Sequence, residues 1–428
     1  MSLVQQKSRT ECRLGETFGC APCEGGRACG AAMYVQGGCR GHFLCHGRSV
    51  HCGQAGDSIG IGRRRCECWY DAPAIFGVVI NNTNGGVPKQ GIFNIAFSWN
   101  APTQTWWGLG RFMQGSGHLG QCWRSRNRPE NHSHYLALSE HATRARNHDS
   151  YRRLPVPPNA MCDNVGEPKW VIEPSAAALL SAPTGASSHI VYCYTNGGCD
   201  TRDGWPHELP TGRRREAYLA STFGNYLFPL PPSWHTEFSA TADATLLSYT
   251  APPDPTDASA KNFLFFAAEG RVHSIALIEP HVVYTLHPLS GHAHVAHMGR
   301  AHETRTDFGF GAHLRLSLSG GPVRIDERTF LVAAHIANVA GGGWWSALRL
   351  TFFYAFEAVA PFRVRCATAP MSFGLSHTVP PLEYATHLEL HDDHLYVSVG
   401  SDNCYSALVR LPVAAVMKRC RALPLHSL

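Results

Sequence analysis

The chain has 428 residues, of which 44% are hydrophobic and 16% are charged, and its formal net charge is +5. That length allows a sizeable core, arranged as two or three domains or as one large repetitive one. The positive charge is spread over arginine-rich loops at 62–65 and 212–215, so we expect no nucleic-acid partner. Since no apolar run reaches the roughly 18 residues of a membrane span, we also expect no span in this chain.

The first part of the chain is unusually rich in cysteine. Residues 1–69 hold few large apolar side chains, so they are predicted to form a separate module held together by disulfides, which contribute roughly 2–4 kcal/mol each. A zinc site on Cys20-x2-Cys23 and Cys66-x-Cys68 is the alternative. Nine of the sixteen cysteines lie here, at Cys12, Cys20, Cys23, Cys29, Cys39, Cys45, Cys52, Cys66 and Cys68.

Two glycosylation sequons agree with an oxidising, secretory setting. They begin at Asn81 and Asn131, whereas the segment 1–10 has no apolar stretch typical of a signal peptide. We therefore expect a secreted or secretory-lumen protein whose signal or anchor is missing from this chain. The alternative is an intracellular protein whose cysteines bind metal.

From residue 70 to 428 the sequence consists of short apolar or alternating runs separated by turn residues, which predicts an all-β domain. Many evenly spaced strands over such a length favour a β-propeller over a sandwich or barrel. Candidate strands lie at Gly91–Trp99, Thr105–Phe112, Tyr135–Ser139, His189–Tyr194, Ala217–Thr222, Asn262–Ala267, Val272–Ile278, His281–Leu286, His313–Leu318, Thr329–Ala334, Trp345–Ala355, Thr386–Leu390 and Leu395–Val399.

Several of these runs carry a family resemblance. The segments are IFNIAFSW, WWGLGRF, YLALSEH, GEPKW, RREAYLAS, KNFLFF with IEPHVV, SGGPVRIDERTFLVAAH, YAFEAVAPFRV and LELHDDHLYVSVGSDNCYSALV. In order and spacing, over roughly 71–421, they resemble the five-bladed β-propeller proteins of the β-mannoside phosphorylase and hydrolase group. Separately, the run MYVQGGCRGHFLC at 33–45 resembles a small secreted cysteine-rich module of unknown function.

The resemblance implies a proton-donating carboxylic acid in a central funnel. Glycosyl cleavage or transfer needs an acid on the leaving oxygen and a nucleophile on the opposite face of the sugar. Glu167, in Gly166-Glu167-Pro168-Lys169, stands where the group carries an Asp, and Asp163 is a nearby substitute. The longer Glu side chain puts the activity in question, because a misplacement of about 1 Å can cost roughly a hundredfold in rate. The alternative is that Glu167 has no catalytic role and only forms an ion pair at the surface or at a strand end.

Binding residues follow from the same resemblance. Lys261 and Asn262 match the group's Lys-Asn motif, whose lysine contributes to an anion site where phosphate is used. The supporting histidine matches only loosely, with His281 several positions beyond the expected place. In Val399-Gly400-Ser401-Asp402-Asn403, Asn403 occupies the place of an acid and fits sugar recognition better than catalysis. The full binding set is Asn94, Arg111, Lys169, Arg215, Lys261, Asn262, His281, Asp402 and Asn403.

Other motifs give weaker predictions. The tryptophan pairs 106–107 and 344–345 could stack on a sugar face or belong to the core. The run His292-Ala293-His294-Val295-Ala296-His297 lacks a carboxylate, so no metal or other cofactor is expected, while inorganic phosphate or a sugar donor is a possible co-substrate. We thus expect a carbohydrate-active enzyme acting on an oligosaccharide or glycan, and a non-catalytic glycan-binding or structural propeller is the second hypothesis.

Overall fold

The computed structural model describes the backbone of the strands between Ser2 and Tyr249, together with Gln104, and longer stretches towards the C-terminus. These stretches are 263–278, 280–287, 290–299, 314–338, 349–373, 375, 383–401 and 405–422. Side-chain surroundings are described for Val35, 94–99, 104–110 and most residues of the later stretches.

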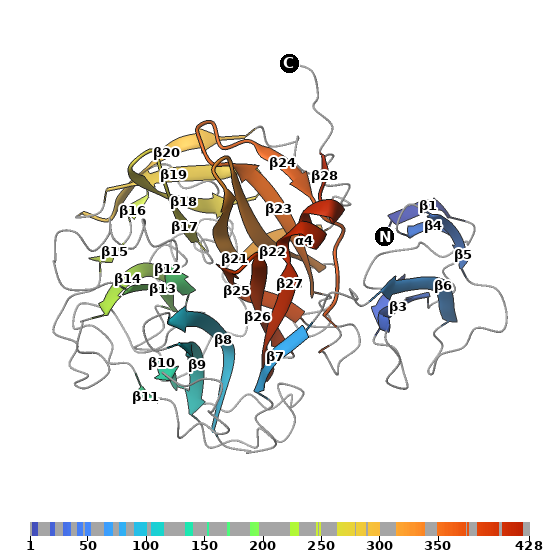
Figure 1. The fold of residues 1–428 in the computed structure, drawn as a ribbon, viewed down its shortest axis with the longest axis horizontal. Coiled ribbons are helices and arrows are strands. Elements are labelled where there is room, and N and C mark those ends of the chain that lie inside the picture. The colour runs from blue at the N-terminus through green and yellow to red at the C-terminus, as the bar shows by residue number, and fades with distance from the viewer. Residues whose placement is uncertain are drawn as a thin grey trace, which may run out of the picture.

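The described N-terminal strands form two antiparallel, three-stranded sheets with the orders β1-β4-β5 and β2-β3-β6. Figure 1 shows them to one side of the remaining sheets. The strands are β1 (Ser2–Gln6), β2 (Phe18–Ala21), β3 (Cys29–Val35), β4 (Gly41–Cys45), β5 (Arg48–Cys52) and β6 (Arg64–Asp71). The predicted module boundary at residue 69 falls within β6.

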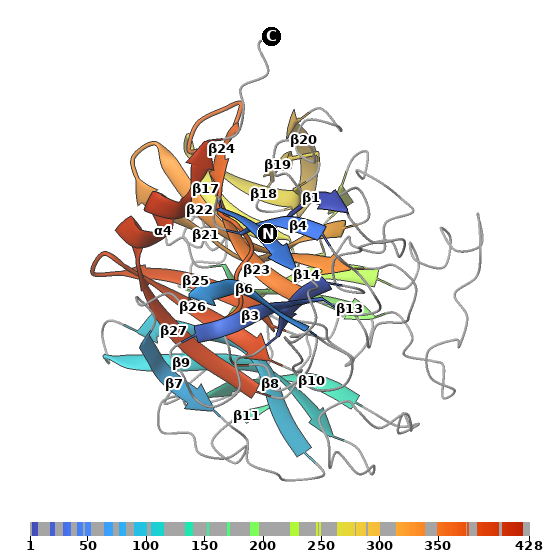
Figure 2. The ribbon, with the colours of Figure 1, turned by 90° about the vertical axis from the view of Figure 1, so that its right-hand side faces the viewer.

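The described strands after Asp71 form five further sheets, named I to V here (Figures 1 and 2). Sheet I contains β8 (Gln90–Asn100), β9 (Thr105–Gln114), β10 (Ser133–Ser139) and β11 (Arg152–Arg153), and sheet II contains β12 (Lys169–Val171), β13 (His189–Asn196), β14 (Phe223–Leu230) and β15 (Thr245–Leu246). Sheet III contains β16 (Ser248–Tyr249), β17 (Leu264–Ala268), β18 (Arg271–Leu277), β19 (Val282–Leu286) and β20 (His292–Met298). Sheet IV contains β21 (Leu314–Asp326), β22 (Thr329–Asn338), β23 (Arg349–Glu357), β24 (Val364–Ala367) and β28 (Arg421–Ala422), and sheet V contains β25 (Glu383–His391), β26 (His394–Ser401), β27 (Tyr405–Pro412) and β7 (Gly77–Asn82).

One edge strand of each sheet contacts an edge strand of the next. These strands are β8, β12, β17, β21 and β25, and the contacts run β8 to β12, β12 to β17, β17 to β21, β21 to β25 and β25 back to β8. Figure 1 shows the five sheets in the same order around the middle of the molecule. Strand β7, which precedes β8 in the chain, pairs antiparallel with β27 in sheet V. The beginning and end of this part of the chain therefore meet in one sheet.

The prediction of an all-β protein is confirmed. The predicted strands at Val272–Ile278 and Thr329–Ala334 match β18 and β22, while the one at Ala217–Thr222 lies outside the described residues, directly before β14. Strands β20 and β27 were not predicted, nor was the helix α4 (Val413–Arg419). The alternating histidines of β20 follow the two-residue period of a strand, because His292 and His294 are exposed while Ala293 is buried.

Buried apolar side chains fill the spaces between sheets. One cluster joins sheets III and IV through Phe266, Phe330 and Phe356, and another joins sheets IV and V through Phe353, Leu388 and Val397. Because neighbouring sheets share these cores, the position of each edge strand depends on the packing of both its neighbours.

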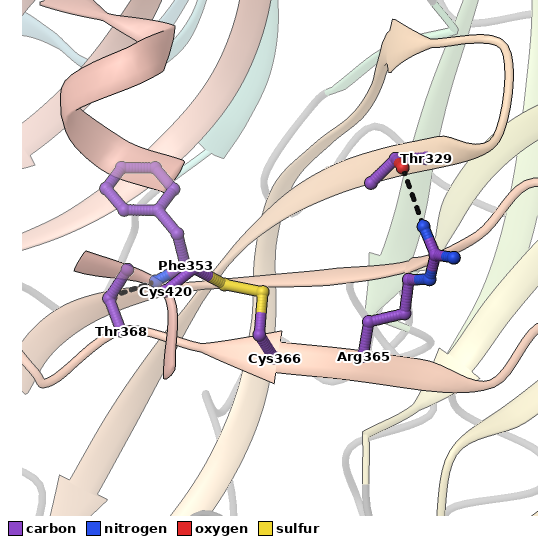
Figure 3. Close-up of a disulfide and its surroundings, with 6 residues drawn as sticks. All are labelled: Thr329, Phe353, Arg365, Cys366, Thr368 and Cys420. Atoms are coloured by element: carbon purple, nitrogen blue, oxygen red, sulfur yellow. Dashed lines mark hydrogen bonds between the residues drawn. A yellow bond between two sulfur atoms is a disulfide. The ribbon is translucent and has the colours of Figure 1, made fainter. Parts of the chain in front are cut away.

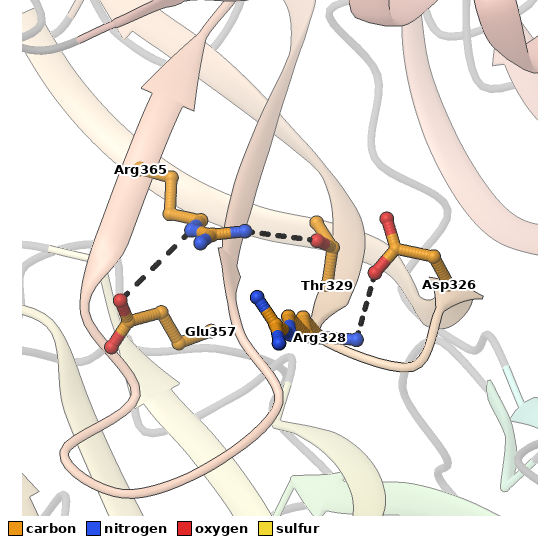
Figure 4. Close-up of polar contacts among 5 residues, drawn as sticks. All are labelled: Asp326, Arg328, Thr329, Glu357 and Arg365. Carbon is orange, nitrogen blue, oxygen red and sulfur yellow. Dashed lines mark hydrogen bonds and ion pairs between the residues drawn. The ribbon is translucent and has the colours of Figure 1, made fainter.

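A disulfide and several polar contacts connect the strands of sheet IV. A disulfide joins Cys366 on β24 to Cys420, directly after α4, beside the short pairing of β24 with β28 (Figure 3). Arg365 donates a 3.2 Å hydrogen bond to Thr329 Oγ1 and lies 3.9 Å from a Glu357 carboxylate oxygen (Figure 4). At the neighbouring turn, the backbone N–H of Arg328 donates to Asp326. The sequence did not predict this cysteine pairing.

Candidate functional site

The structure places only some of the predicted site residues. Asn94 and His281 have described side-chain surroundings, whereas Arg111 and Lys169 are placed by their backbones alone, in β9 and β12. The predicted acids Glu167 and Asp163 lie outside the described residues. So do Arg215, Lys261, Asn262, Asp402 and Asn403.

Asn94 lies at an irregularity in β8, where the ladder to β9 shifts register between Phe93 and Ala96. Its φ is +54°, a left-handed conformation that Asn tolerates better than most residues, and its side chain is only 1% exposed. Bulges of this kind turn a strand and redirect its side chains. The irregularity brings Asn94 against sheet V.

Asn94 and the end of β26 come from two separately predicted motifs and lie together. A Cβ atom built on Gly400 would lie 2.6 Å from Asn94 Oδ1, so the glycine is what allows this approach. Ser401, the next residue, is 1% exposed, and its hydroxyl has no hydrogen-bond partner among the described residues. In the sequence, Asp402 and Asn403 follow directly.

A buried carboxylate, Glu383, lies across the ladder from Ser401 at the start of β25. Its residue is 0% exposed, and its two oxygens accept hydrogen bonds from Ser372 Oγ at 2.9 Å and from the backbone N–H groups of Phe373 (2.6 Å) and Leu375. These donors favour a fixed carboxylate that holds Ser372, Phe373 and Leu375 against β25. The sequence analysis missed Glu383, since an acid at a strand start carries no signal of burial.

Strand β8 is fastened to sheet V by side chains rather than by a neighbouring strand. The N–H groups of alternate β8 residues donate to acceptors on β25, β26 and β27. Three such bonds are Ile95 N–H to Ser406 Oγ (3.1 Å), Phe97 N–H to Ser398 Oγ (2.9 Å) and Trp99 N–H to Glu389 Oε2 (2.7 Å). The Thr386 hydroxyl returns a bond to the Ile95 carbonyl at 3.0 Å. These bonds, termed the β8 seam, satisfy backbone N–H and C=O groups on this edge of β8 and help to fix the position of Asn94.

Glu389, at the far end of that seam, is a second acid the sequence analysis missed. Burial raises the pKa of its carboxyl group to about 8, although the Trp99 N–H and the Ser98 side chain act in the opposite direction. Its surroundings are aromatic: Trp99 and Trp106 lie 5.4 Å apart by ring centroids, and Trp106 and Tyr396 lie 4.9 Å apart. A carboxyl group that is mostly protonated at pH 7 can donate a proton.

The aromatic pair Trp106 and Trp107 is part of the core. Each residue is 6% exposed, which leaves little ring surface for a sugar to stack on. The pair Trp344 and Trp345 lies outside the described residues.

His281 lies in the turn between β18 and β19, at the end of sheet III where β17 begins. It is 2% exposed, and burial, followed by repulsion from His297, lowers its pKa to about 3. The ring is therefore neutral at ordinary pH, and it could meet a phosphate only as a hydrogen-bond partner, not as a cation. Lys261 and Asn262 immediately precede Phe263 and β17 in the sequence.

Across the part of the chain that the structure describes, no three His, Cys, Asp or Glu side chains gather as metal ligands would. No helix in that same part is both long and apolar enough to cross a membrane.

Comparisons with known proteins find distant structural similarity and no matching family. No protein-family model matches the chain, and no curated protein matches it. Among solved structures, a β-1,2-mannobiose phosphorylase from Listeria innocua is similar with a TM-score of 0.44 and 11% identity, over 81% of this chain and 93% of that one. A mannose phosphorylase from Leishmania mexicana is similar with a TM-score of 0.41 and 8% identity (81% and 92% covered), and a glycosyl hydrolase from Bacteroides ovatus with 0.41 and 9% (78% and 86%).

Proposed function

We propose that residues 70–428 form a five-bladed β-propeller with a carbohydrate-active site at the ends of its innermost strands. The cyclic contact of β8, β12, β17, β21 and β25 supports this proposal, because the innermost strands of a propeller surround a common axis in that way. The pairing of β7 with β27 gives the last blade a strand from the beginning of the domain.

Several of the predicted site residues lie on those innermost strands or directly before them in the sequence. Lys169 begins β12 and Glu167 stands two residues before it. Lys261 and Asn262 precede β17, while Asn94 lies within β8. Residues distant in sequence are thus assigned to adjoining strands, as a shared site requires.

In the proposed reaction, Glu167 protonates the glycosidic oxygen of a mannoside-like substrate, and Asp163 is the alternative acid. Water or inorganic phosphate attacks the opposite face of the sugar, or an acceptor receives it. Lys169, Lys261, Asn262 and Asn403 bind the sugar or phosphate, together with Arg111, Arg215 and Asp402, whereas the 2% exposure of His281 favours a place in the core over direct contact with the ligand. Because His281 is buried and neutral, the positive charge for a phosphate would come from the lysines and arginines.

Asn94 belongs to this site as a supporting group. Its 1% exposure and its contact with Gly400 favour a role in holding the end of β26, directly before Asp402 and Asn403, over direct contact with a sugar.

A non-catalytic glycan-binding propeller is the second candidate. It is favoured by the two positions where this chain departs from the motifs of the resemblance, Glu167 and Asn403. An amide retains sugar recognition without acid catalysis, so binding would survive the loss of turnover.

Cleavage of manno-oligosaccharides, measured with and without phosphate, separates the two candidates. We expect Glu167→Gln to lower kcat by roughly 10² to 10⁴, the usual contribution of a general acid, while the exposed control Glu327→Gln has no effect. Full turnover by Glu167→Gln removes this residue from the mechanism. Binding without turnover by the natural chain supports the second candidate.

We further propose that residues 1–69 form a disulfide-stapled module and that the protein resides in the secretory pathway. The Cys366–Cys420 bond is compatible with this location, since disulfides persist mainly in oxidising compartments. Mass measurement after alkylation of the denatured, unreduced protein tests the idea. A full set of alkylated N-terminal cysteines contradicts it.

A further inference from the structure

The contact between sheets III and IV is an aromatic core with histidines embedded in it. Phe266 from β17 lies 4.9 Å from Phe330 and 5.2 Å from Phe356, both in sheet IV, by ring centroids. His273 from β18 stacks on Phe266 at 5.2 Å and lies 4.9 Å from Phe362. The tight packing of rings from both sheets makes this contact, termed the III–IV joint, sensitive to any new charge.

His281 is the least exposed of the histidines in this core. Its ring centroid lies 5.4 Å from that of Phe356 and 5.9 Å from that of Tyr354, and the residue is 2% exposed. Neither ring nitrogen has a hydrogen-bond partner among the described residues. A protonated imidazole carries two N–H donors and a charge, and among the described residues it has neither a hydrogen-bond acceptor nor an acidic group that acts on it.

The charged and titratable groups around the joint do not relieve this problem. His297 from β20 lies 6.3 Å from His281, and its own pKa is lowered first by burial and then by Arg363. His273 is faced by Glu269 and Arg271, and its ring nitrogen Nδ1 lies 3.2 Å from Thr285 Oγ1. Of these described groups only Glu269 is acidic, and it acts on His273. Acidification therefore adds like charge next to His281.

We propose that the III–IV joint is an acid-sensitive contact, which loosens when His281 takes up a proton. The protonated His281 ring is unfavourable in the closed joint, so protonation shifts the equilibrium towards molecules in which the joint is open. This inference concerns the fold and is independent of the proposed sugar chemistry.

The effect of pH on closure of the joint follows from the pKa of His281 in the closed and open states. His281 has a pKa of about 3 when closed and 6.5 when solvated. Between these values the open state binds more protons, so closure is favoured above pH 6.5 and becomes weaker as the pH falls. When the pH falls from 7.5 to 5, proton binding to the solvated His281 ring raises the equilibrium constant for opening about 30-fold.

Amide hydrogen exchange of β19 and β23 tests the proposal when rates at pH 7.5 and 5 are normalised for intrinsic exchange. We expect opening of the natural chain to increase about 30-fold or more. In His281→Phe this increase should be about 30-fold smaller. The control His292→Gln, an exposed histidine of the same sheet, should behave as the natural chain.

An equal acid response in the natural chain and in His281→Phe overturns the proposal. If that variant does not fold, the imidazole resonance of His281 in the natural chain decides. A ring that titrates near pH 6.5 while β19 and β23 stay protected contradicts the proposal, and a ring that takes up a proton only as this protection is lost supports it.

Discussion

Gly400 lies so close to Asn94 that no side chain fits between them. Because a Cβ at Gly400 would come 2.6 Å from Asn94 Oδ1, a distance that real Cβ atoms essentially never show, Gly400→Ala must displace the buried Asn94 side chain or one of the two strands. We expect a loss of roughly 1–3 kcal/mol in unfolding free energy, as for other overpacked sites, measured by urea denaturation. In an Asn94→Gly background, which removes the opposing atom and suits the positive φ, the loss should shrink. Equal losses in both backgrounds would contradict the clash.

Glu389 gives a pH dependence of the opposite sign to that of His281. Its pKa is about 8 in the folded chain and 4.5 as the ordinary value, so between these values the folded state holds the extra proton. Its contribution to stability is fully present below pH 4.5 and declines as the pH rises towards 8, by at most about 1.4 kcal/mol per pH unit. Glu389→Gln keeps an acceptor for the Trp99 N–H and removes the titration. The urea midpoint of the variant should therefore improve, relative to the natural chain, from pH 5 to pH 8, and a constant difference would refute this assignment.

Buried acids were not predicted from the sequence. Asn94 and the segment after Gly400 were predicted as binding residues from the family resemblance, and that role stays a prediction. Glu383 and Glu389 were missed because their burial is created by partners distant in sequence, such as Trp99 for Glu389. No local pattern reports such a pKa shift. The roles proposed for Glu167 and Lys261 still rest on their motifs, since both lie outside the described residues.

Among the elements, strands with a clear apolar period were the easiest to predict. Val272–Ile278 matches β18 within a residue at either end, whereas α4 is too short to show a helical period and follows Pro412 without a side-chain cap. Lys418 and Arg419 in its last turn suit the negative end of the helix dipole. A tertiary constraint, the Cys420 disulfide, also fixes its end.

That disulfide should stabilise the elements it joins. It links residues 54 apart, β24 to the end of α4, with all of β25–β27 inside the loop. The chain-entropy account of cross-links gives roughly 4 kcal/mol for such a loop. Cys366→Ser with Cys420→Ser should lower the unfolding free energy by up to that amount in calorimetry or urea titration. Adding reductant to this double variant should change little at this link, and an unchanged stability in the double variant would show that the loop is not a constraint.

At the scale of the whole molecule, sheets I to V contact one another in sequence order through their edge strands. The first strands of this part of the chain, β7 and β8, both contact the last sheet, sheet V. β7 pairs with β27, while β8 is held by Ser398, Thr386 and Ser406. Sheet V therefore binds β7 through a backbone ladder and β8 through side-chain acceptors. Because β7 and β27 are far apart in the sequence, the stability of sheet V depends on both of these segments.

Truncation separates the contribution of the N-terminal sheets from that of the pairing of β7 with β27. A chain starting at residue 72 lacks β1–β6 but keeps β7, and we expect it to keep the C-terminal sheets with a modestly lower thermal midpoint, because it loses Val35 of β3, which is buried in the same cluster as Phe266 and Phe330. A chain starting at residue 84 also lacks β7 and exposes the edge of β27, so it should lose roughly 3 kcal/mol or more, at about 0.5–1.5 kcal/mol for each ladder hydrogen bond. Equal midpoints for the two truncated chains, measured by circular dichroism, would show that the pairing of β7 with β27 does not stabilise these sheets. A collapse already at the first truncation would instead make residues 1–71 part of the same cooperative unit.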